Sequence, residues 1–363
     1  MRKKHVILFV SLVTLVILSV MFRAVWVAAG ATPKGVRLER CRKSGHWHDG
    51  SFVNEEPTRM MTGDSNLFET FMAFLFNKEK GLSPSDFLLT NKTVLKYLER
   101  DKDVVVWLGH SSLFIQMNGK RFLFDPVLTN RLPVSLFMRP FKGSDVYTPD
   151  DIPAVDYLVI THDHWDHLDY ETIKELKDRV GAVYCPLGVG QHFEYWGYEN
   201  EKICEMNWND SVSLDSGLTL HCLPSRHFSG RLLARNKTLW ASFLIDGKKR
   251  IFVSGDGGYD GRFRRLGERF KNIDLAVMEN GQYDNNWKHI HSLPSELPKE
   301  IKELGAERVM TYHNSKYALA HHSWKAPLDS IWNNAIKYDI NLLVPSIGMS
   351  VDLDDYDNFE KWW

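Results

Sequence analysis

The first thirty residues contain a long uncharged run. A basic triplet precedes the stretch from Val6 to Phe22, and Arg23 closes it. A helix of that length crosses most of a bilayer, whereas the apolar part of a secretory signal has about 7–15 residues before a cleavage site of small residues. Residues 28–31 offer such a site, but Arg23 separates it from the run. We expect residues 1–30 to anchor the protein in a membrane, with cleavage and secretion as the alternative.

Basic residues lie on both sides of this run and compete to set its orientation. They are Arg2, Lys3 and Lys4 before it, and Lys34, Arg37, Arg40, Arg42 and Lys43 after it. The orientation therefore stays open from sequence, and our expectation is an anchored protein with an extracytoplasmic catalytic domain.

The next seventy residues differ from the rest of the chain. Residues 31 to about 60 are polar and interrupted by glycine and proline, which is typical of a linker or an extended arm. Between Asn66 and about Glu99 the pattern predicts two helices, the first very apolar and ending at Gly81. We expect them to pack on the catalytic domain, with contact to a membrane surface as the alternative. The predicted organisation is an N-terminal segment (1–30), an arm with helices (31–100) and a catalytic domain (101–363).

From Val104 onward, strands alternate with helices. An Asn118-Gly119 pair between two apolar runs predicts a hairpin, and a buried strand, YLVIT, precedes a predicted helix at about 169–180. Polar or ionisable residues gather at the C-terminal ends of successive strands, where ligands bind in α/β sheets. The pattern therefore predicts an α/β domain with a site along one sheet edge.

Two segments of this domain are similar to each other. SSLFIQMNGKRFLFD and ASFLIDGKKRIFVSGD both predict hairpins, with turns at Asn118-Gly119 and Asp246-Gly247, and each ends on an aspartate, Asp125 or Asp256. Chance is one explanation. The other is that the domain has two related β/α halves, which meet where these aspartates converge.

The amino-acid composition favours no particular class of function. Apolar residues make up 44% and charged residues 25% of 363 residues, as in ordinary globular proteins. Lys+Arg (45) and Asp+Glu (46) nearly cancel, so the charge does not favour nucleic acid, and the basic segment 261–271 is interpreted as a solvated helix face. The four cysteines have no C-x-x-C spacing; Cys185 and Cys222 lie in predicted buried strands. Neither the redox compartment nor the oligomeric state follows from these numbers.

The segment THDHWDHLD, directly after a strand, carries four potential metal ligands within six positions: His162, His164, Asp166 and His167. Alternate residues at a strand end point the same way, so His162 and His164 can bind one ion together. The turn that follows carries Asp166 and His167 to the other side, and so tight a loop suits two adjacent ions better than one. Imidazole and carboxylate ligands without thiolate favour zinc, with manganese or iron as alternatives.

Three further candidates end later strands: His227 in LPSRHFSGR, Asp256 in VSGDGG and His313 in VMTYHNSK. A carboxylate between two glycines, as at Asp256, could bridge two metals. A single histidine at a strand end is more often a hydrogen-bonded core residue. Joined to the central segment, however, the three candidates complete the ligand sets of two ions.

This order of residues, H-x-H-x-D-H, a later histidine, a strand-end aspartate and a final histidine, resembles the metallo-β-lactamase superfamily. Other motifs resemble its N-acylphosphatidylethanolamine-hydrolysing phospholipase D group: DGSFVNEEPT (49–58), WLGHSS (107–112), DPV (125–127), PSRH (224–227), LWASF (239–243), SGD (254–256) and HSLP (291–294). The likeness runs from about residue 45 to the C-terminus.

The resemblance implies a four-layer αββα sandwich with a site for two Zn²⁺. It implies that His162, His164 and His227 bind one ion, that Asp166, His167 and His313 bind the other, and that Asp256 bridges them. Two departures concern the substrate rather than the metals. The last ligand lies in Tyr-His-Asn-Ser-Lys where the group usually has His-Trp-Gly, and Gly257 follows SGD in place of threonine.

By this likeness the protein is a zinc-dependent phosphodiesterase that acts on a phospholipid or related ester through a dizinc-bound hydroxide. Asp166 is the candidate to orient the nucleophile. His291 resembles a substrate-facing histidine of the group and could protonate the leaving group, with an ordinary loop histidine as the alternative. Asp125, Asp169 and His110 are the candidates to support the metal-binding imidazoles.

Other functions stay open from sequence alone. Fold and metals do not choose the bond, so a lactonase or another carboxylic-ester hydrolase is one alternative. A membrane-tethered metal-binding protein without turnover is another, although a pure binder has no need of an open two-metal centre. The apolar stretches 132–141 and 192–198 could line a lipid-accommodating groove or pack as core.

Overall fold

The computed structural model describes residues 2–63, 81–131, 135, 138–356 and 359–363. Most of the first helix expected between Asn66 and Gly81 lies outside these residues. So does part of the stretch 132–141.

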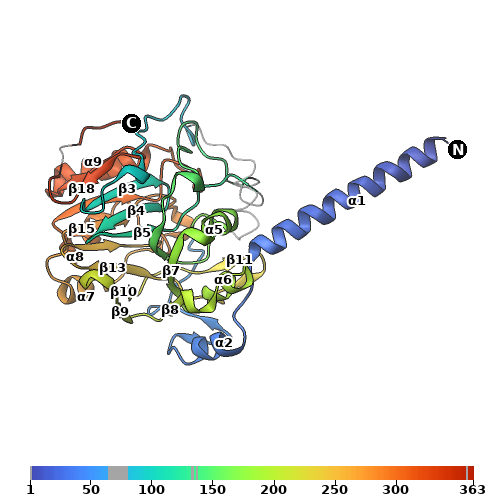
Figure 1. Cartoon of the computed structure of the whole chain (residues 1–363). Helices are drawn as coiled ribbons and strands as arrows, with labels where there is room; N and C mark the ends of the chain where they lie inside the picture. The colour runs from blue at the N-terminus through green and yellow to red at the C-terminus, as the bar shows by residue number, and fades with distance from the viewer. Residues whose placement is uncertain (1, 64–80, 132–134, 136–137, 357–358) are drawn as a thin grey trace.

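Two seven-stranded sheets form the centre of the protein (Figure 1). The first has the order β18 (Ser350–Asp352), β3 (Val104–Gly109), β4 (Ser112–Met117), β5 (Lys120–Phe124), β6 (Val155–Val159), β7 (Val180–Pro186) and β8 (Ile203–Met206). The second has the order β17 (Leu342–Leu343), β16 (Arg308–Tyr312), β15 (Leu275–Glu279), β14 (Arg250–Val253), β13 (Ser242–Asp246), β10 (Thr219–Leu223) and β9 (Ser211–Ser213).

Helices cover the outer face of each sheet. The helices α5 (Tyr170–Leu176) and α6 (Gly190–Tyr195) belong to the first sheet, and α7 (Arg262–Arg269), α8 (Leu297–Leu304) and α9 (Ala326–Tyr338) belong to the second. Short 3₁₀ helices lie at Leu95–Tyr97, Pro149–Asp151, Lys177–Arg179, Asn200–Lys202, Asp215–Gly217 and Asn285–Trp287.

Three apolar clusters hold these layers together. The largest lies between the sheets and joins Trp107 to Phe243. The second packs helices on the first sheet, as Phe193 does against the strands around Phe114, and the third packs Phe263 of α7 with Phe252 of the second sheet. Helix, sheet, sheet and helix therefore form four layers, which confirms the αββα sandwich expected from the resemblance.

The two sheets repeat one arrangement. In the first, the antiparallel β4–β5 hairpin continues into the parallel strands β6 and β7; in the second, the β13–β14 hairpin continues into β15 and β16. Asn118 and Gly119 both have positive φ, as the two-residue turn between β4 and β5 requires. The other turn has three residues, because Asp246 pairs with Arg250. Of the two explanations open from the sequence, this repeated arrangement favours two related halves, one built on each sheet.

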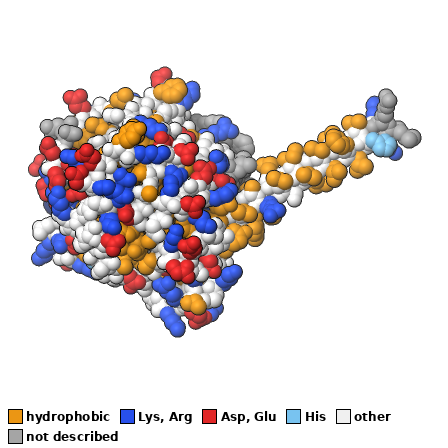
Figure 2. Space-filling model, in the orientation of Figure 1, with side chains coloured by type: hydrophobic (Ala, Val, Ile, Leu, Met, Phe, Trp, Pro, Cys, Tyr) orange, Lys and Arg blue, Asp and Glu red, His pale blue; other side chains and the backbone are white. Residues whose placement is uncertain are grey.

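The N-terminal region is more closely joined to the domain than the sequence suggested. Helix α1 (Arg2–Ala29) extends away from the domain, and hydrophobic side chains cover it (Figure 2). Lys3–Ala29 is long and apolar enough to cross a membrane. After it come α2 (Gly35–Arg42), β1 (Trp47–His48) and β2 (Ser51–Phe52).

The expected linker from residue 31 to about 60 is therefore not an unattached arm. Cys41 and Phe52 are fully buried in the cluster between the sheets, and the Nη1 atom of Arg37 lies 3.0 Å from the buried carboxylate of Glu205. Sequence patterns missed this because these contacts join residues more than 150 positions apart.

The prediction of a second helix before Glu99 is also wrong. In residues 81–99, the structure has a 3₁₀ turn and no α-helix. The backbone N–H groups of Asn91 and Thr93 instead donate to the carbonyls of Ile347 and Gly348, both at 2.9 Å. Pairing with a distant segment has replaced local helix hydrogen bonds here.

Candidate metal centre

The loop after β6 brings three imidazoles together. His162 Nε2 lies 2.9 Å from His164 Nδ1, and His227 Nε2, from the loop after β10, lies 3.2 Å from the same atom. Two nitrogen ligands of a tetrahedral zinc ion are about 3.3 Å apart, because each Zn–N bond is about 2.0–2.1 Å. The three rings therefore have the spacing of ligands to a common ion, as expected for this trio.

A second group lies beside the first. His313 follows β16, and its Nε2 atom is 3.1 Å from His167 Nε2 and 3.3 Å from Asp166 Oδ2. Asp256 reaches both histidines: Oδ1 is 3.3 Å from His167 Nε2, and Oδ2 is 3.2 Å from His313 Nε2. These four residues could hold another metal ion.

Asp256 also faces the first group. Its Oδ2 atom is 3.7 Å from His227 Nε2 and 4.0 Å from His162 Nε2. Its Oδ1 atom is buried without a hydrogen-bond partner among the described residues, which is costly unless another group, such as a cation, satisfies it. The structure thus brings together all seven ligand candidates, with Asp256 between the two sets.

The electrostatic surroundings of Asp166 favour its charged carboxylate form. Burial disfavours the charged form of Asp166, but His167 and hydrogen bonds with His110 and His313 outweigh it and hold the pKa of the carboxyl well below its usual range. Asp166 is therefore ionised at neutral pH, and it lines the pocket above the histidines.

Supporting contacts come from behind the ligands. Asp125 Oδ2 lies 2.8 Å from His167 Nδ1, and His110 Nε2 lies 2.9 Å from Asp166 Oδ2. Asp125 occupies the supporting position suggested for it, and His110 also supports a ligand candidate, although this is the Asp166 carboxylate and not an imidazole. Asp169 does not, because it caps α5: its Oδ2 atom accepts from the backbone N–H of Thr172 at 3.2 Å and from the hydroxyl of Thr129 at 2.6 Å. A helix start directly after a metal motif makes these two roles hard to separate in sequence.

The N-terminal arm holds His227 in place. Asn54 donates to the carbonyl of His227 at 2.8 Å, and its side-chain oxygen accepts from the backbone N–H of His227 at 3.1 Å and from the indole of Trp240 at 3.0 Å. Next to His227, Arg226 donates to the hydroxyl of Thr58 at 3.0 Å. Two residues of the segment 49–58 thus help to position His227 and its neighbour.

One buried carboxylate went unnoticed in the sequence. Glu279 ends β15, and its Oε1 atom lies 3.0 Å from His291 Nδ1 and 3.7 Å from His313 Nδ1. Its other oxygen accepts from the backbone N–H of Ser292 at 2.9 Å. The signal was a charged residue at the end of an otherwise apolar strand, LAVME (275–279). Glu279 therefore fixes the orientation of His291.

A cavity of about 370 Å³ opens over the histidines. Its lining combines metal-ligand candidates and His291 with Arg235, Gln282 and apolar side chains from several segments: Met60, Met61, Phe228, Trp287, Ile290 and Leu319. The stretch 192–198 does not line it, because Phe193 and Tyr198 pack in the core of the first sheet.

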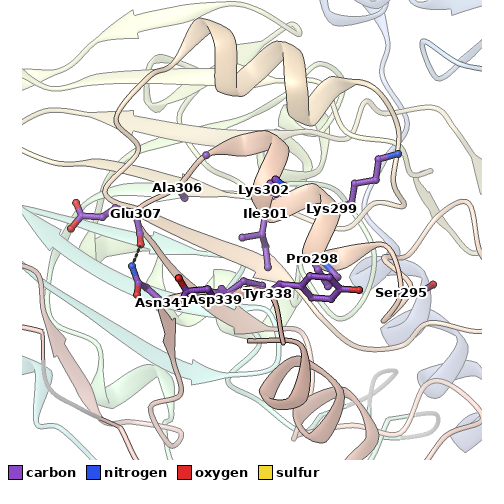
Figure 3. A pocket seen from close by; sticks show the side chains of 12 residues that line it. Ser295, Pro298, Lys299, Ile301, Lys302, Ala306, Glu307, Tyr338, Asp339 and Asn341 are labelled. Carbon is purple, nitrogen blue, oxygen red and sulfur yellow. Dashed lines mark hydrogen bonds between the residues drawn. The ribbon is translucent and has the colours of Figure 1, made fainter. Parts of the chain in front are cut away.

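A larger cavity of about 490 Å³ lies elsewhere, between α8 and the segment from Tyr338 to Asn341. Figure 3 shows its lining, in which Asn341 donates to the carbonyl of Glu307 at 3.0 Å. None of its twelve lining residues is a histidine or cysteine. Size alone therefore does not identify the chemical site.

The remaining predictions from the sequence have simple outcomes. Cys185 and Cys222 are buried and free, as expected. The basic segment 261–271 contains α7, whose Arg264, Arg265 and Arg269 are exposed, as expected for a solvated helix face, whereas Arg262 is buried. Met138 and Phe141, from the described part of 132–141, are also buried.

Comparison with known proteins agrees with this geometry. Residues 120–314 match the family described as the β-lactamase superfamily domain. An uncharacterized protein of Mycobacterium tuberculosis is 32% identical over 345 residues, which cover 93% of this chain and 91% of that protein. The N-acyl-phosphatidylethanolamine-hydrolyzing phospholipase D 1 of Caenorhabditis elegans is 29% identical, with 59% of this chain and 64% of that protein covered.

Among solved structures, the fold is similar to that of Igni18, a metallo hydrolase from the archaeon Ignicoccus hospitalis. The TM-score is 0.54 at 19% identity, with 69% of this chain and 98% of that chain covered. The protein therefore belongs to the metallo-β-lactamase superfamily, as a metallo-hydrolase of the group similar to N-acylphosphatidylethanolamine-hydrolysing phospholipase D.

Proposed function

We propose that the protein is a dizinc phosphodiesterase that hydrolyses phospholipid-like substrates at a membrane. The observation that carries the proposal is the position of Asp256 between two groups of ligands, beneath a cavity with apolar walls. His162, His164 and His227 would hold one ion; Asp166, His167 and His313 would hold the other; Asp256 would bridge them. Two ions held there would activate water at neutral pH and stabilise negative charge on the reacting group.

The chain's own residues supply the rest of the chemistry. Asp166, fixed by His110, would orient the attacking water and accept its hydrogen bond. Glu279 holds His291 at Nδ1, which leaves Nε2 to deliver a proton to the leaving oxygen. Arg235 on the cavity lining would bind the substrate phosphate, because a guanidinium pairs well with phosphate oxygens.

The apolar walls and α1 favour a lipid substrate. Met60, Met61 and Phe228 would accommodate acyl chains next to the ligand cluster. Helix α1 would keep the enzyme at the membrane where such a substrate resides. The relative from Caenorhabditis elegans supports this substrate class by the activity in its name.

Substrate choice is tested by comparing three compounds: an N-acyl phosphatidylethanolamine, a soluble phosphodiester and a lactone, each with and without chelator. Zinc, manganese and iron are then restored separately. We expect chelator-sensitive release of phosphatidic acid from the lipid, fastest with zinc. In water enriched in ¹⁸O the label should enter the phosphate of that product, since attack at phosphorus is proposed. Label in a released fatty acid, or a lactone as the best substrate, would contradict the proposal.

A pair of histidines tests the proton donor. His291→Asn removes a cavity-lining imidazole, whereas His289→Asn changes a histidine two positions away that is not part of the lining. General acid catalysis contributes about 10²–10⁴-fold, so kcat for His291→Asn should fall by that order while metal content is retained. His289→Asn should retain activity. Equal rates for the two variants would remove His291 from the mechanism.

A further inference from the structure

The C-terminal end of the apolar helix α1 is docked on the catalytic domain. Arg231 donates through Nη2 to the carbonyl of Ala28 at 2.7 Å, and the indole of Trp196 donates to the carbonyl of Val27 at 2.8 Å. Just beyond the helix, the backbone N–H of Ala31 donates to His192 Nδ1 at 3.1 Å. The last carbonyls of a helix lack partners within it, so these contacts fix where α1 leaves the domain, beside β11 (Gly230–Arg231) in Figure 1.

Arg231 also contacts the loop that carries the ligand candidates. Its Nη1 atom donates to the carbonyls of Asp163 at 2.9 Å and Leu168 at 2.8 Å, and its guanidinium lies 3.7 Å from the ring centroid of Trp165. The neighbouring Gly230 donates its backbone N–H to the Asp163 carboxylate at 2.8 Å. One buried side chain thus joins the end of α1 to the segment between His162 and Asp169.

The hairpin that contains Arg231 presents two leucines to solvent. Strands β11 and β12 (Ala234–Arg235) are joined by Leu232 and Leu233, which are 51% and 98% exposed. Leu232 has a φ of 52°, which is unfavourable for a branched apolar residue. The backbone is held in a disfavoured conformation that places apolar side chains in water, so neither folding nor solubility accounts for this tip.

The tip lies between the end of α1 and the mouth of the histidine cavity. Leu232 directly follows Arg231, which contacts Ala28, and Arg235, two positions after Leu233, lines the cavity. Two residues span at most about 7 Å. A membrane that contains α1 would therefore reach the tip as well.

We propose that Leu232 and Leu233 insert into the membrane interface beside α1 and hold the mouth of the histidine cavity against the lipid surface. The occupant is a lipid bilayer, because the tip is continuous with the docked end of a helix that is apolar enough to span one. Apolar side chains on interfacial elements enter the headgroup and acyl boundary by about 5–10 Å. The proposal deepens the proposed function and rests on it for the nature of the substrate.

Depth in the membrane is measured with a polarity-sensitive fluorophore on full-length protein in phospholipid vesicles. The label is attached at Leu233→Cys and, as the matched control, at Ile336→Cys; Ile336 is 73% exposed on α9. The parent chain labelled in the same way gives the background from Cys204, since Cys41, Cys185 and Cys222 are buried. We expect blue-shifted emission and quenching by spin-labelled lipid at 233, and an aqueous signal at 336.

Two results would overturn the proposal. One is an aqueous signal at position 233 in vesicles. The other is a blue shift without quenching by spin-labelled lipid, which would mean that another protein surface covers the tip. Neither reading depends on catalysis, so the membrane contact is tested even if the phosphodiesterase proposal fails.

Turnover gives a second readout. Leu233→Ser should lower kcat/KM on phospholipid in vesicles by about tenfold, since a fully inserted leucine is lost. Hydrolysis of a soluble phosphodiester should be unchanged, and Ile336→Ser should affect neither substrate. Equal loss on lipid and soluble substrates would show that the tip shapes the cavity itself and would contradict membrane insertion. Absence of phosphodiester hydrolysis by the parent chain would reject the proposed function alone.

Discussion

The β4–β5 and β13–β14 hairpins occupy equivalent places in the two sheets, and each is followed by an aspartate. Asp125 comes directly after β5, and Asp256 comes three positions after β14. Asp125 contacts Nδ1 of His167 at 2.8 Å, whereas Asp256 contacts Nε2 of the same ring at 3.3 Å. The two halves therefore meet on opposite edges of one imidazole.

A turn accounts for the different roles. Gly255 has a φ of 59° and carries the chain past the end of β14, so Asp256 extends among the imidazoles while Asp125 stays behind them. Burial raises the pKa of Asp125, although His167 opposes it. For Asp256, burial acts in the same direction, but His167, His313 and His227 outweigh it and hold the pKa well below the usual value. Equivalent positions in a repeated fold thus lie in different places, Asp125 behind the ligand candidates and Asp256 among them.

The largest expected effect comes from Asp256→Asn. Removing the bridging charge should lower kcat/KM by about a thousandfold, because metal ions contribute several kcal/mol to charge stabilisation and about 1.4 kcal/mol corresponds to tenfold. Bound metal per chain should fall as well. Asp274→Asn, in the same half but away from the cluster, is the control. If Asp256→Asn retains both metal and activity, Asp256 is not the bridge.

Gly255→Ala should have the next largest effect. An added Cβ would lie 2.6 Å from the carbonyl oxygen of Ala241, so the turn must shift and carry Asp256 with it. A displacement of about 1 Å at a catalytic group can lower the rate about a hundredfold. The control is Gly217→Ala, where φ is also positive but nothing lies within 4 Å. Similar activities of the two variants would mean that the turn does not position Asp256.

Asp125→Asn should weaken metal binding by about 10–100-fold, as expected for a group that orients a ligand. The amide still accepts at one atom but no longer carries the charge that favours His167 Nδ1–H. Titration with zinc in competition with a chelator measures the change. A loss as large as that of Asp256→Asn would erase the distinction between support and ligand.

Asp169→Ala should have the smallest effect on the centre. This residue caps α5 and contacts none of the ligand imidazoles, so we expect a loss of about 1 kcal/mol in unfolding free energy, within the range of a helix cap, and unchanged metal content. Thermal or denaturant unfolding of the metal-loaded protein gives the first value. A drop in bound metal would place Asp169 in the supporting shell after all.

The sequence alone predicted the parts of the structure that depend on local pattern. Alternating strands and helices, the Asn118-Gly119 turn and strand-end ligands all follow from periodicity and spacing. The resemblance then gave the layer order. The seven ligand candidates came from four strand ends, and the structure places their side chains together.

Features that depend on distant contacts were missed. Residues 31–60 looked like a linker because their partners, Glu205 and His227, lie far along the chain. Asp169 looked like a support for a metal ligand because an aspartate that caps a helix and an aspartate that supports a ligand cannot be told apart in the sequence. Glu279 was overlooked because its strand is otherwise apolar. Its role in orienting His291 follows only from the folded structure, in which His291 lies 3.0 Å away.

The central claim is that this chain holds two metal ions bridged by Asp256, and metal content tests it most directly. Full-length protein purified without added metal is analysed by mass spectrometry for zinc, manganese and iron, next to the Asp256→Asn variant and a chelator-treated sample. The account predicts two divalent ions per chain in the parent, mainly zinc, and fewer than two in the variant. No stoichiometric metal in the parent, after reloading with each of the three metals as well, would contradict it.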